Sequence, residues 1–141
     1  MPLHPLQSDS PVIVYIDFKS PYAYLAVEPT RALERELDVK FDWRPFVLDI
    51  PSYLGSARPD KTGKVAEQNR STEQWSGVKY AYFDCRRYAG LSGKTIRGTV
   101  KIWDTNLVAT AMLWVRQHHE QSLHAVIYAV SVPFWKRELN V

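Results

Sequence analysis

The stretch that decides the fold is VIVYIDFKSPYAYL, residues 12–25. Its first five residues are apolar, which predicts a strand that is buried on both faces. Ser20 is a favoured residue for the N-cap of a helix, and Pro21 suits the first helical position. One hydroxyl is therefore expected at the point where a strand has ended and a helix dipole begins. Such a position favours an anion, and a thiolate is an anion.

The residues that follow predict a helix and a second strand. Residues 21–37 are predicted to form the helix, which Pro29 is expected to bend or restart. Its expected apolar stripe consists of Tyr22, Leu25, Ala26, Leu33 and Leu37. Residues 39–48 (VKFDWRPFVL) alternate well enough to form a strand. Because only a helix separates the two strands, we expect a right-handed βαβ unit with parallel strands.

The rest of the chain is predicted to be mostly helical. Residues 49–70 are rich in Pro and Gly, which predicts a long irregular segment with at most one short helical turn. A helix is expected over 72–89. After a connector, Asp104 or Thr105 is expected to cap a helix that runs to about His118. A last helix is predicted over 120–131, with Pro133 kinking or restarting it.

The charge of the chain is unevenly distributed. The 141 residues include 18 Lys or Arg and 15 Asp or Glu, for a net charge of +3. Residues 58–101 hold ten basic and four acidic side chains, so this segment carries +6. A local basic surface suits a small anionic ligand or a nucleic acid, and a solvated face explains it equally well. Since no aromatic and basic motif that reads bases is present, we expect no nucleic-acid partner.

Composition also restricts the compartment. Cys85 is the single cysteine, so an intrachain disulfide is impossible and the reducing cytoplasm is the expected location. No apolar run approaches the length of a membrane span, and no membrane partner is expected. Residues 1–10 lack the basic start and apolar stretch of a signal peptide, and are predicted to form a flexible leader.

Several segments, in order along the chain, resemble one group of proteins. They are FKSPYAYLA (18–26), WRPF (43–46), Lys79-Tyr80 with Asp84 and Arg87, and FWKREL (134–139). The group comprises the 2-hydroxychromene-2-carboxylate isomerases and kappa-class glutathione transferases, in the DsbA-like branch of the thioredoxin superfamily. The resemblance implies an α/β chain with an incomplete thioredoxin-like fold. Its βαβ half would span 11–48, and a mostly helical insertion domain would span 49–141.

The resemblance also implies departures from the group's usual pattern. The later strands and last helix of the fold have no counterpart within 1–141. The group closes its site with a Val-Pro dipeptide, whereas Val132-Pro133 precedes residues of helical character, so we do not expect that loop here. An incomplete sheet should seek a partner by edge pairing, and we therefore expect a homo-oligomer.

The group's chemistry is carried over residue by residue. Its redox members use a Cys-x-x-Cys pair, but residues 20–23 contain no cysteine, which excludes dithiol exchange there. In the isomerases and transferases a serine at the first position donates a hydrogen bond to the sulfur of glutathione, and Ser20 would take that role. Other candidates for glutathione or substrate contacts are Lys19, Pro21, Tyr22, Trp43, Arg58, Lys61, Arg97 and Trp103. Since His118 and His119 are adjacent and no third ligand is evident, no metal site is expected.

Three functions follow from these observations. The first is a glutathione-dependent isomerase or transferase of small aromatic or carboxylate compounds. The second is a non-catalytic DsbA-like scaffold, or a truncated form without activity. The third, a nucleic-acid binder that uses residues 58–101, is the least favoured. Serine is also a common N-cap, so Ser20 by itself does not decide between them.

Overall fold

The computed structural model describes residue 4, residues 6–62 and residues 64–141, and it is a mixed α/β structure. Strand β1 (Ile13–Ile16) is followed by helix α1 (Pro21–Leu37) and strand β2 (Asp42–Pro45). The two strands pair in parallel, with Ile13 opposite Asp42 and Ile16 opposite Pro45. The predicted parallel βαβ unit is therefore confirmed, although β2 is shorter than the 39–48 segment expected.

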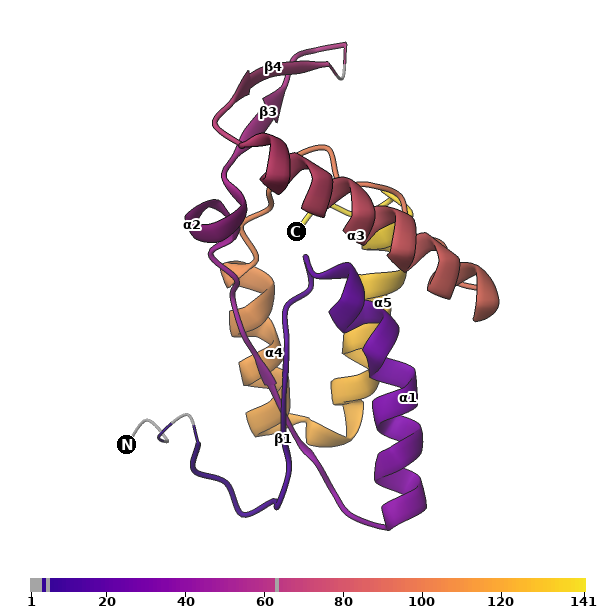
Figure 1. Cartoon of the computed structure of the whole chain (residues 1–141). Coiled ribbons are helices and arrows are strands. Elements are labelled where there is room, and N and C mark those ends of the chain that lie inside the picture. The colour runs from indigo at the N-terminus through magenta and orange to yellow at the C-terminus, as the bar shows by residue number, and fades with distance from the viewer. Residues whose placement is uncertain (1–3, 5, 63) are drawn as a thin grey trace.

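The middle of the chain holds an element that the sequence did not predict. After the short helix α2 (Ile50–Leu54), strands β3 (Ala57–Pro59) and β4 (Val65–Gln68) form an antiparallel hairpin, so the expectation of an irregular segment was wrong here. The hairpin extends beyond the N-terminal end of α3 (Figure 1). Every described residue of β4 is exposed, and an exposed strand has no apolar alternation to reveal it.

Three further helices were predicted, although the last one, expected over 120–131, begins and ends later than that. Helix α3 (Thr72–Leu91) begins at a capping box in which Ser71 Oγ accepts from Gln74 N–H while the Gln74 side chain accepts from Ser71 N–H. Helix α4 (Asn106–His118) has Thr105 at its N-cap. A 3₁₀ turn (Glu120–Ser122) leads into α5 (Leu123–Trp135), which contains Pro133. Among the described helices, none combines the length and apolar character needed to cross a bilayer.

The face that α1 buries differs from the predicted stripe. The buried residues are Tyr24 and Val27, whereas Leu33 and Leu37 are 47% and 54% exposed. Glu34 lies on the inward side, where its carboxylate accepts hydrogen bonds from the Phe41 amide (2.6 Å) and the Trp43 indole (3.3 Å). A charged residue thus occupies a position that the pattern assigned to solvent. The helix also continues through Pro29 and does not restart there.

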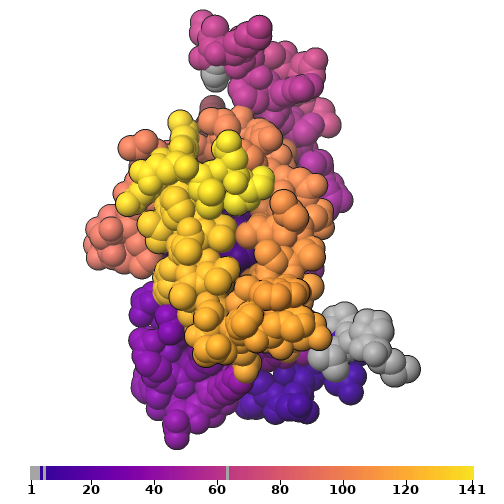
Figure 2. Space-filling model, turned by 180° about the vertical axis from the view of Figure 1, so that it is seen from behind, coloured from indigo at the N-terminus to yellow at the C-terminus, as the bar shows by residue number. Residues whose placement is uncertain are grey.

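Two clusters of buried side chains form the core. The first joins the sheet to α4 and α5 and consists of Ile16, Phe18, Val27, Phe41, Trp43, Met112, Leu123 and Ile127. The second joins α1, α3 and α5 and consists of Tyr24, Cys85, Ala89, Ile96, Phe134 and Trp135. Seen from behind, α4 and α5 lie in front of the sheet, and a small indigo patch of the early chain shows between them (Figure 2). Both clusters draw on both sides of residue 48, and the predicted division there stays a prediction.

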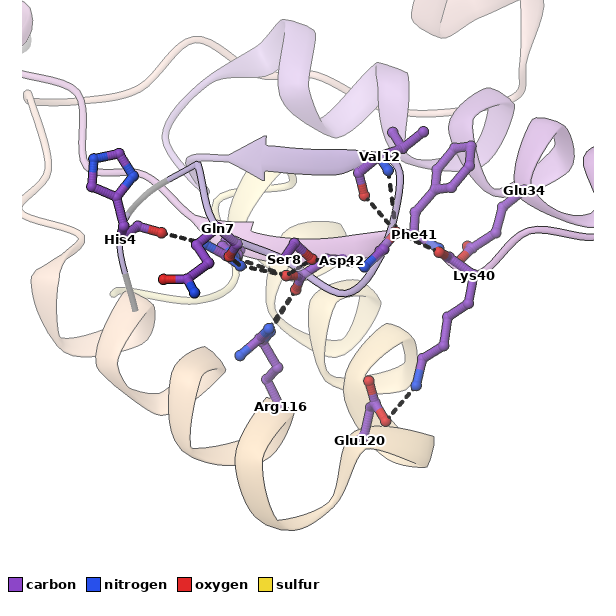
Figure 3. Close-up of polar contacts among 12 residues, drawn as sticks. His4, Gln7, Ser8, Val12, Glu34, Lys40, Phe41, Asp42, Arg116 and Glu120 are labelled. Atoms are coloured by element: carbon purple, nitrogen blue, oxygen red, sulfur yellow. Dashed lines mark hydrogen bonds and ion pairs between the residues drawn. The ribbon is translucent and has the colours of Figure 1, made fainter. Parts of the chain in front are cut away.

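Asp42 ties the N-terminal segment to β2 (Figure 3). Its carboxylate accepts hydrogen bonds from Arg44 Nε (2.9 Å), Arg116 Nε (2.8 Å) and Ser8 Oγ (2.7 Å). Arg44 donates in addition to the carbonyl oxygens of His4 and Gln7. These bonds hold the described part of residues 1–10 against the sheet. Residues 1–3 and 5 lie outside the described residues, and the flexible leader stays a prediction.

Candidate functional site

A cavity of about 950 Å³ opens beside Ser20, at the N-terminus of α1. Its walls come from the first turn of α1, α2, the hairpin, α3 and the loop before α4. In Figure 1 the start of α1 lies beneath α3, which places the end of β1 next to the middle of the chain. Volumes between about 300 and 1,000 Å³ are typical of sites for small molecules.

The Ser20 side chain both caps the helix and reaches the cavity. Its Oγ accepts a hydrogen bond from the Ala23 amide (3.2 Å), and its own amide donates to Asp17 O (3.0 Å). Because Oγ serves the helix as an acceptor, the hydroxyl proton remains available for donation to a ligand. Within the described part of the chain, the Tyr22 amide finds no acceptor. The site therefore presents hydrogen-bond donors at the positive end of a helix dipole.

Lys19 lies behind Ser20 in a buried cluster. Its ammonium nitrogen is 3.0 Å from Asp17 Oδ2 and donates to Thr105 Oγ1 at 3.2 Å. Thr105 in turn donates to Asp17 Oδ1 (2.7 Å), and the Leu48 amide donates to Asp17 Oδ2 (2.7 Å). The cluster joins the end of β1 to the N-cap of α4 and to the segment after β2. The Lys19 charge is thus already paired inside the protein, although the residue lines the cavity.

Tyr22 connects α1 to α3 at the cavity's edge. Its hydroxyl donates to Asp84 Oδ2 at 2.8 Å, and this bond, followed by burial, raises the pKa of the phenol well above its usual range. Tyr22 therefore stays neutral. Burial raises the pKa of the neighbouring Cys85 thiol, which is completely inaccessible. A buried thiol of raised pKa is a poor nucleophile.

The other predicted site residues separate into two groups. Lys61 and Trp103 line the cavity with Ser20, Pro21 and Tyr22. Trp43, Arg58 and Arg97 do not. Trp43 is 2% exposed and packs in the core with its ring edge-on to His124 (4.9 Å between centroids). Arg58 and Arg97 are exposed outside the lining of this cavity.

Most of the cavity's lining was not identified from the sequence. Its aromatic side chains are Tyr22, Tyr53, Trp75, Tyr82 and Trp103. Its basic side chains are Lys19, Lys61, Arg70, Lys79, Arg86, Lys101 and Arg137, against one acidic residue, Asp60. The +6 segment 58–101 was the signal for this surface, because five of the seven basic residues come from it. The cavity is therefore suited to an aromatic or anionic ligand.

Comparisons of the chain with protein-family models, with curated proteins and with solved structures found no match. The described residues also contain no group of three or more His, Cys, Asp and Glu side chains that could hold a metal ion. His118 and His119 instead pack against the Trp114 ring, with centroids 4.8 and 5.2 Å away.

Proposed function

We propose that this chain is a glutathione-dependent isomerase or transferase of small aromatic or carboxylate compounds. The observation that carries the proposal is the Ser20 hydroxyl, which has a proton to donate and faces a cavity at the start of a helix. A free thiol has a pKa of about 8.5, so it is mostly protonated at neutral pH. A donated hydrogen bond and a helix N-terminus both favour the thiolate.

The residues around Ser20 fit glutathione as the source of that thiolate. Ser20 and the Tyr22 amide offer donors, and the basic lining of the cavity complements the tripeptide's carboxylates. When bound, glutathione supplies a nucleophile that adds to a conjugated electrophile and is expelled again after a bond has rotated. The protein's part is to hold the sulfur beside Ser20 Oγ and to provide an aromatic wall, Trp103, for the second substrate.

The proposal includes the finer features that the resemblance implies. The parallel βαβ unit, with a helix cap directly after β1, supports a thioredoxin-like topology. The sheet formed by β1 and β2 has two strands, and sheets of that size are marginal alone, which supports a homo-oligomer. The single cysteine supports a cytoplasmic location. Light scattering on the purified chain tests the oligomer, and a folded monomer at high concentration contradicts it.

The direct test is calorimetric titration with reduced glutathione on the wild type, Ser20→Ala and Ser71→Ala. Ser71 is a matched control, because it caps α3 with the same 3.2 Å bond to a backbone amide and does not line the cavity. Both variants should lose a similar stability, about 1 kcal/mol. Glutathione binding should weaken in Ser20→Ala alone. Equal binding by Ser20→Ala and the wild type contradicts the proposal and leaves a scaffold without catalysis.

A second pair of variants separates capping from donation. Ser20→Asp keeps a cap acceptor but has no proton to donate when ionised, whereas Ser20→Thr keeps both functions. We expect Ser20→Thr to retain glutathione binding and Ser20→Asp to lose it. Ultraviolet absorbance of the bound thiolate as a function of pH provides the second readout. In the wild type the pKa of bound glutathione should lie below the free value.

A further inference from the structure

Two arginines from distant parts of the chain converge over Gly98, in the loop before α4. A Cβ placed on Gly98 would lie 3.2 Å from Arg86 Nη2 and 3.8 Å from Arg137 Nη2. The two nitrogens are therefore no farther apart than the sum of those distances. Arg86 comes from α3, and Arg137 follows the end of α5. Both side chains line the cavity that Ser20 reaches.

The backbone of the loop holds both guanidinium groups in place. Arg86 Nε donates to Ile96 O (3.3 Å), and Arg137 Nε donates to Gly98 O (2.6 Å). The loop is itself fixed, because the Arg97 amide donates to Trp135 O (2.9 Å) and the Ile96 side chain is buried. Each arginine thus donates its Nε–H to a backbone carbonyl of the loop. The outer Nη groups are left to face the same space above Gly98.

Arg137 has a backbone conformation that arginine rarely adopts. Its φ of 62° places it in the left-handed region, at the position after a helix where glycine is usual. The Arg137 amide donates to Phe134 O (3.0 Å) and the Glu138 amide to Pro133 O (2.8 Å), which completes the helix ending. The left-handed conformation costs a residue other than glycine free energy, so an arginine at this position indicates a function for its side chain.

Neither guanidinium is neutralised by a carboxylate of the residues that the structure describes. Among the described residues, no carboxylate oxygen lies within 4.0 Å of a guanidinium nitrogen of Arg86 or Arg137. Asp84, the acid nearest to Arg86 in sequence, accepts from Tyr22 and pairs with Arg87 instead. Two like charges that face one space repel each other unless an anion lies between them.

We propose that Arg86 and Arg137 form a binding site for the phosphate group of a phosphorylated ligand. Two guanidinium groups carry two positive charges, which a phosphate dianion neutralises and a single carboxylate does not. Their Nη groups can donate to phosphate oxygens, and guanidinium is the group of choice for such contacts. The glycine keeps the space open, since any side chain at residue 98 would crowd Arg86. The site does not depend on the chemistry proposed for Ser20.

The test is titration of the purified chain with inorganic phosphate, with chloride at equal ionic strength as the reference. Binding is measured by the rise in melting temperature and by amide chemical shifts of the loop around Gly98. Arg86→Gln and Arg137→Asn each remove one guanidinium, and asparagine tolerates the positive φ. Each variant should bind phosphate at least about tenfold more weakly. Arg87→Gln is the matched control and should bind as the wild type does, because Arg87 does not line the cavity.

The outcomes distinguish this site from the one at Ser20. Ser20→Ala should keep full phosphate binding even where it loses glutathione. Phosphate binding should weaken as the pH falls through the second pKa of inorganic phosphate, where the dianion gains a proton. A response no larger than that to chloride overturns the proposal, and so does wild-type affinity in Arg86→Gln. Acetate binding as tight as phosphate binding, with no pH dependence across the second pKa of phosphate, would indicate a carboxylate site and also overturn the proposal.

Discussion

Arg44 and Arg116 converge on the carboxylate of Asp42, whereas Arg86 and Arg137 converge over Gly98 without a carboxylate from the described residues. In the first cluster, formed by Asp42, Arg44 and Arg116, the protein supplies its own anion. The result is a fixed attachment of α4 and the N-terminal segment to β2 (Figure 3). In the second cluster, formed by Arg86 and Arg137, the described residues supply no anion. The comparison teaches that a similar convergence of charge can serve structure or binding, depending on one residue between the arginines.

The largest expected effect comes from Asp42→Asn, which removes the anion of the first cluster. Arg44 is 8% exposed and would keep its charge without the Asp42 carboxylate. Loss of one member of a buried ion pair typically costs about 3–5 kcal/mol. Urea denaturation measures the change. Asp9→Asn, at an exposed aspartate, is the control and should change the free energy of unfolding by less than about 0.5 kcal/mol. Similar stabilities of the two variants would contradict the structural role of the first cluster.

Acid should break the ion pairs of the first cluster by protonating the Asp42 carboxylate. Burial by itself raises the pKa of the Asp42 carboxyl, but hydrogen bonds from Arg44, Ser8 and Arg116 outweigh it, so the pKa lies below its usual value. A carboxyl whose pKa is lower in the folded state stabilises that state at pH values above its pKa in the unfolded chain, which is about 3.9. This contribution is lost as the pH falls through the lower pKa of the folded state. The free energy of unfolding, measured from about pH 5 to pH 3, should fall more steeply for the wild type than for Asp42→Asn. Parallel curves would show that Asp42 does not titrate this way.

A carboxylate placed between Arg86 and Arg137 should pair with both arginines, as Asp42 pairs with Arg44 and Arg116 in the first cluster. Gly98→Asp provides it, and Gly98→Asn is the matched neutral variant. We expect Gly98→Asp to be more stable than Gly98→Asn by about 0.5–1 kcal/mol, which is the usual size for exposed ion pairs. The difference should disappear at about 1 M salt, where screening is nearly complete. Gly98→Asp should also lose the response to phosphate, and a retained response would contradict the comparison.

The smallest effect is expected from Arg86→Gln without phosphate. The variant loses a 3.3 Å hydrogen bond to Ile96 O but also relieves repulsion from Arg137, and these contributions oppose each other. The free energy of unfolding should change by less than about 0.5 kcal/mol, in contrast with Asp42→Asn. A large destabilisation in the same urea assay would show that Arg86 serves the fold and would weaken the contrast between the clusters.

Local signals predicted much of the fold. Ser20 with Pro21 marked the start of α1, because a side-chain cap is a contact within a few residues. Thr105 also lies at the start of α4, but its hydroxyl donates to Asp17 and does not cap the helix. The faces of the helices could not be predicted in the same way. On α4 the apolar side chains of Leu107 and Trp114 are 79% and 53% exposed, and the buried residues are Ala109 and Met112. Which side of a helix is buried depends on its neighbours, which the sequence pattern does not name.

The candidate site shows the same division. Ser20, Pro21 and Tyr22 are adjacent in sequence, so one motif predicted them together, and the excess of basic residues in 58–101 indicated an anion-binding surface. No pattern could pair Arg86 with Arg137, because residues that lie far apart in the chain meet only through packing. Trp43 was a candidate for the ligand wall, but its position on β2 places it in the core instead.

The sequence by itself determined where α1, α3 and α4 begin, the parallel strand order of the βαβ unit and the hydroxyl at the head of α1. Those features depend on hydrogen bonds and steric preferences between residues close in the chain. Only the tertiary structure decided which charges are neutralised and which are left facing the cavity. Neutralisation needs side chains from separate elements to meet, and Asp42 meets Arg116 from α4 while no carboxylate among the described residues meets Arg137.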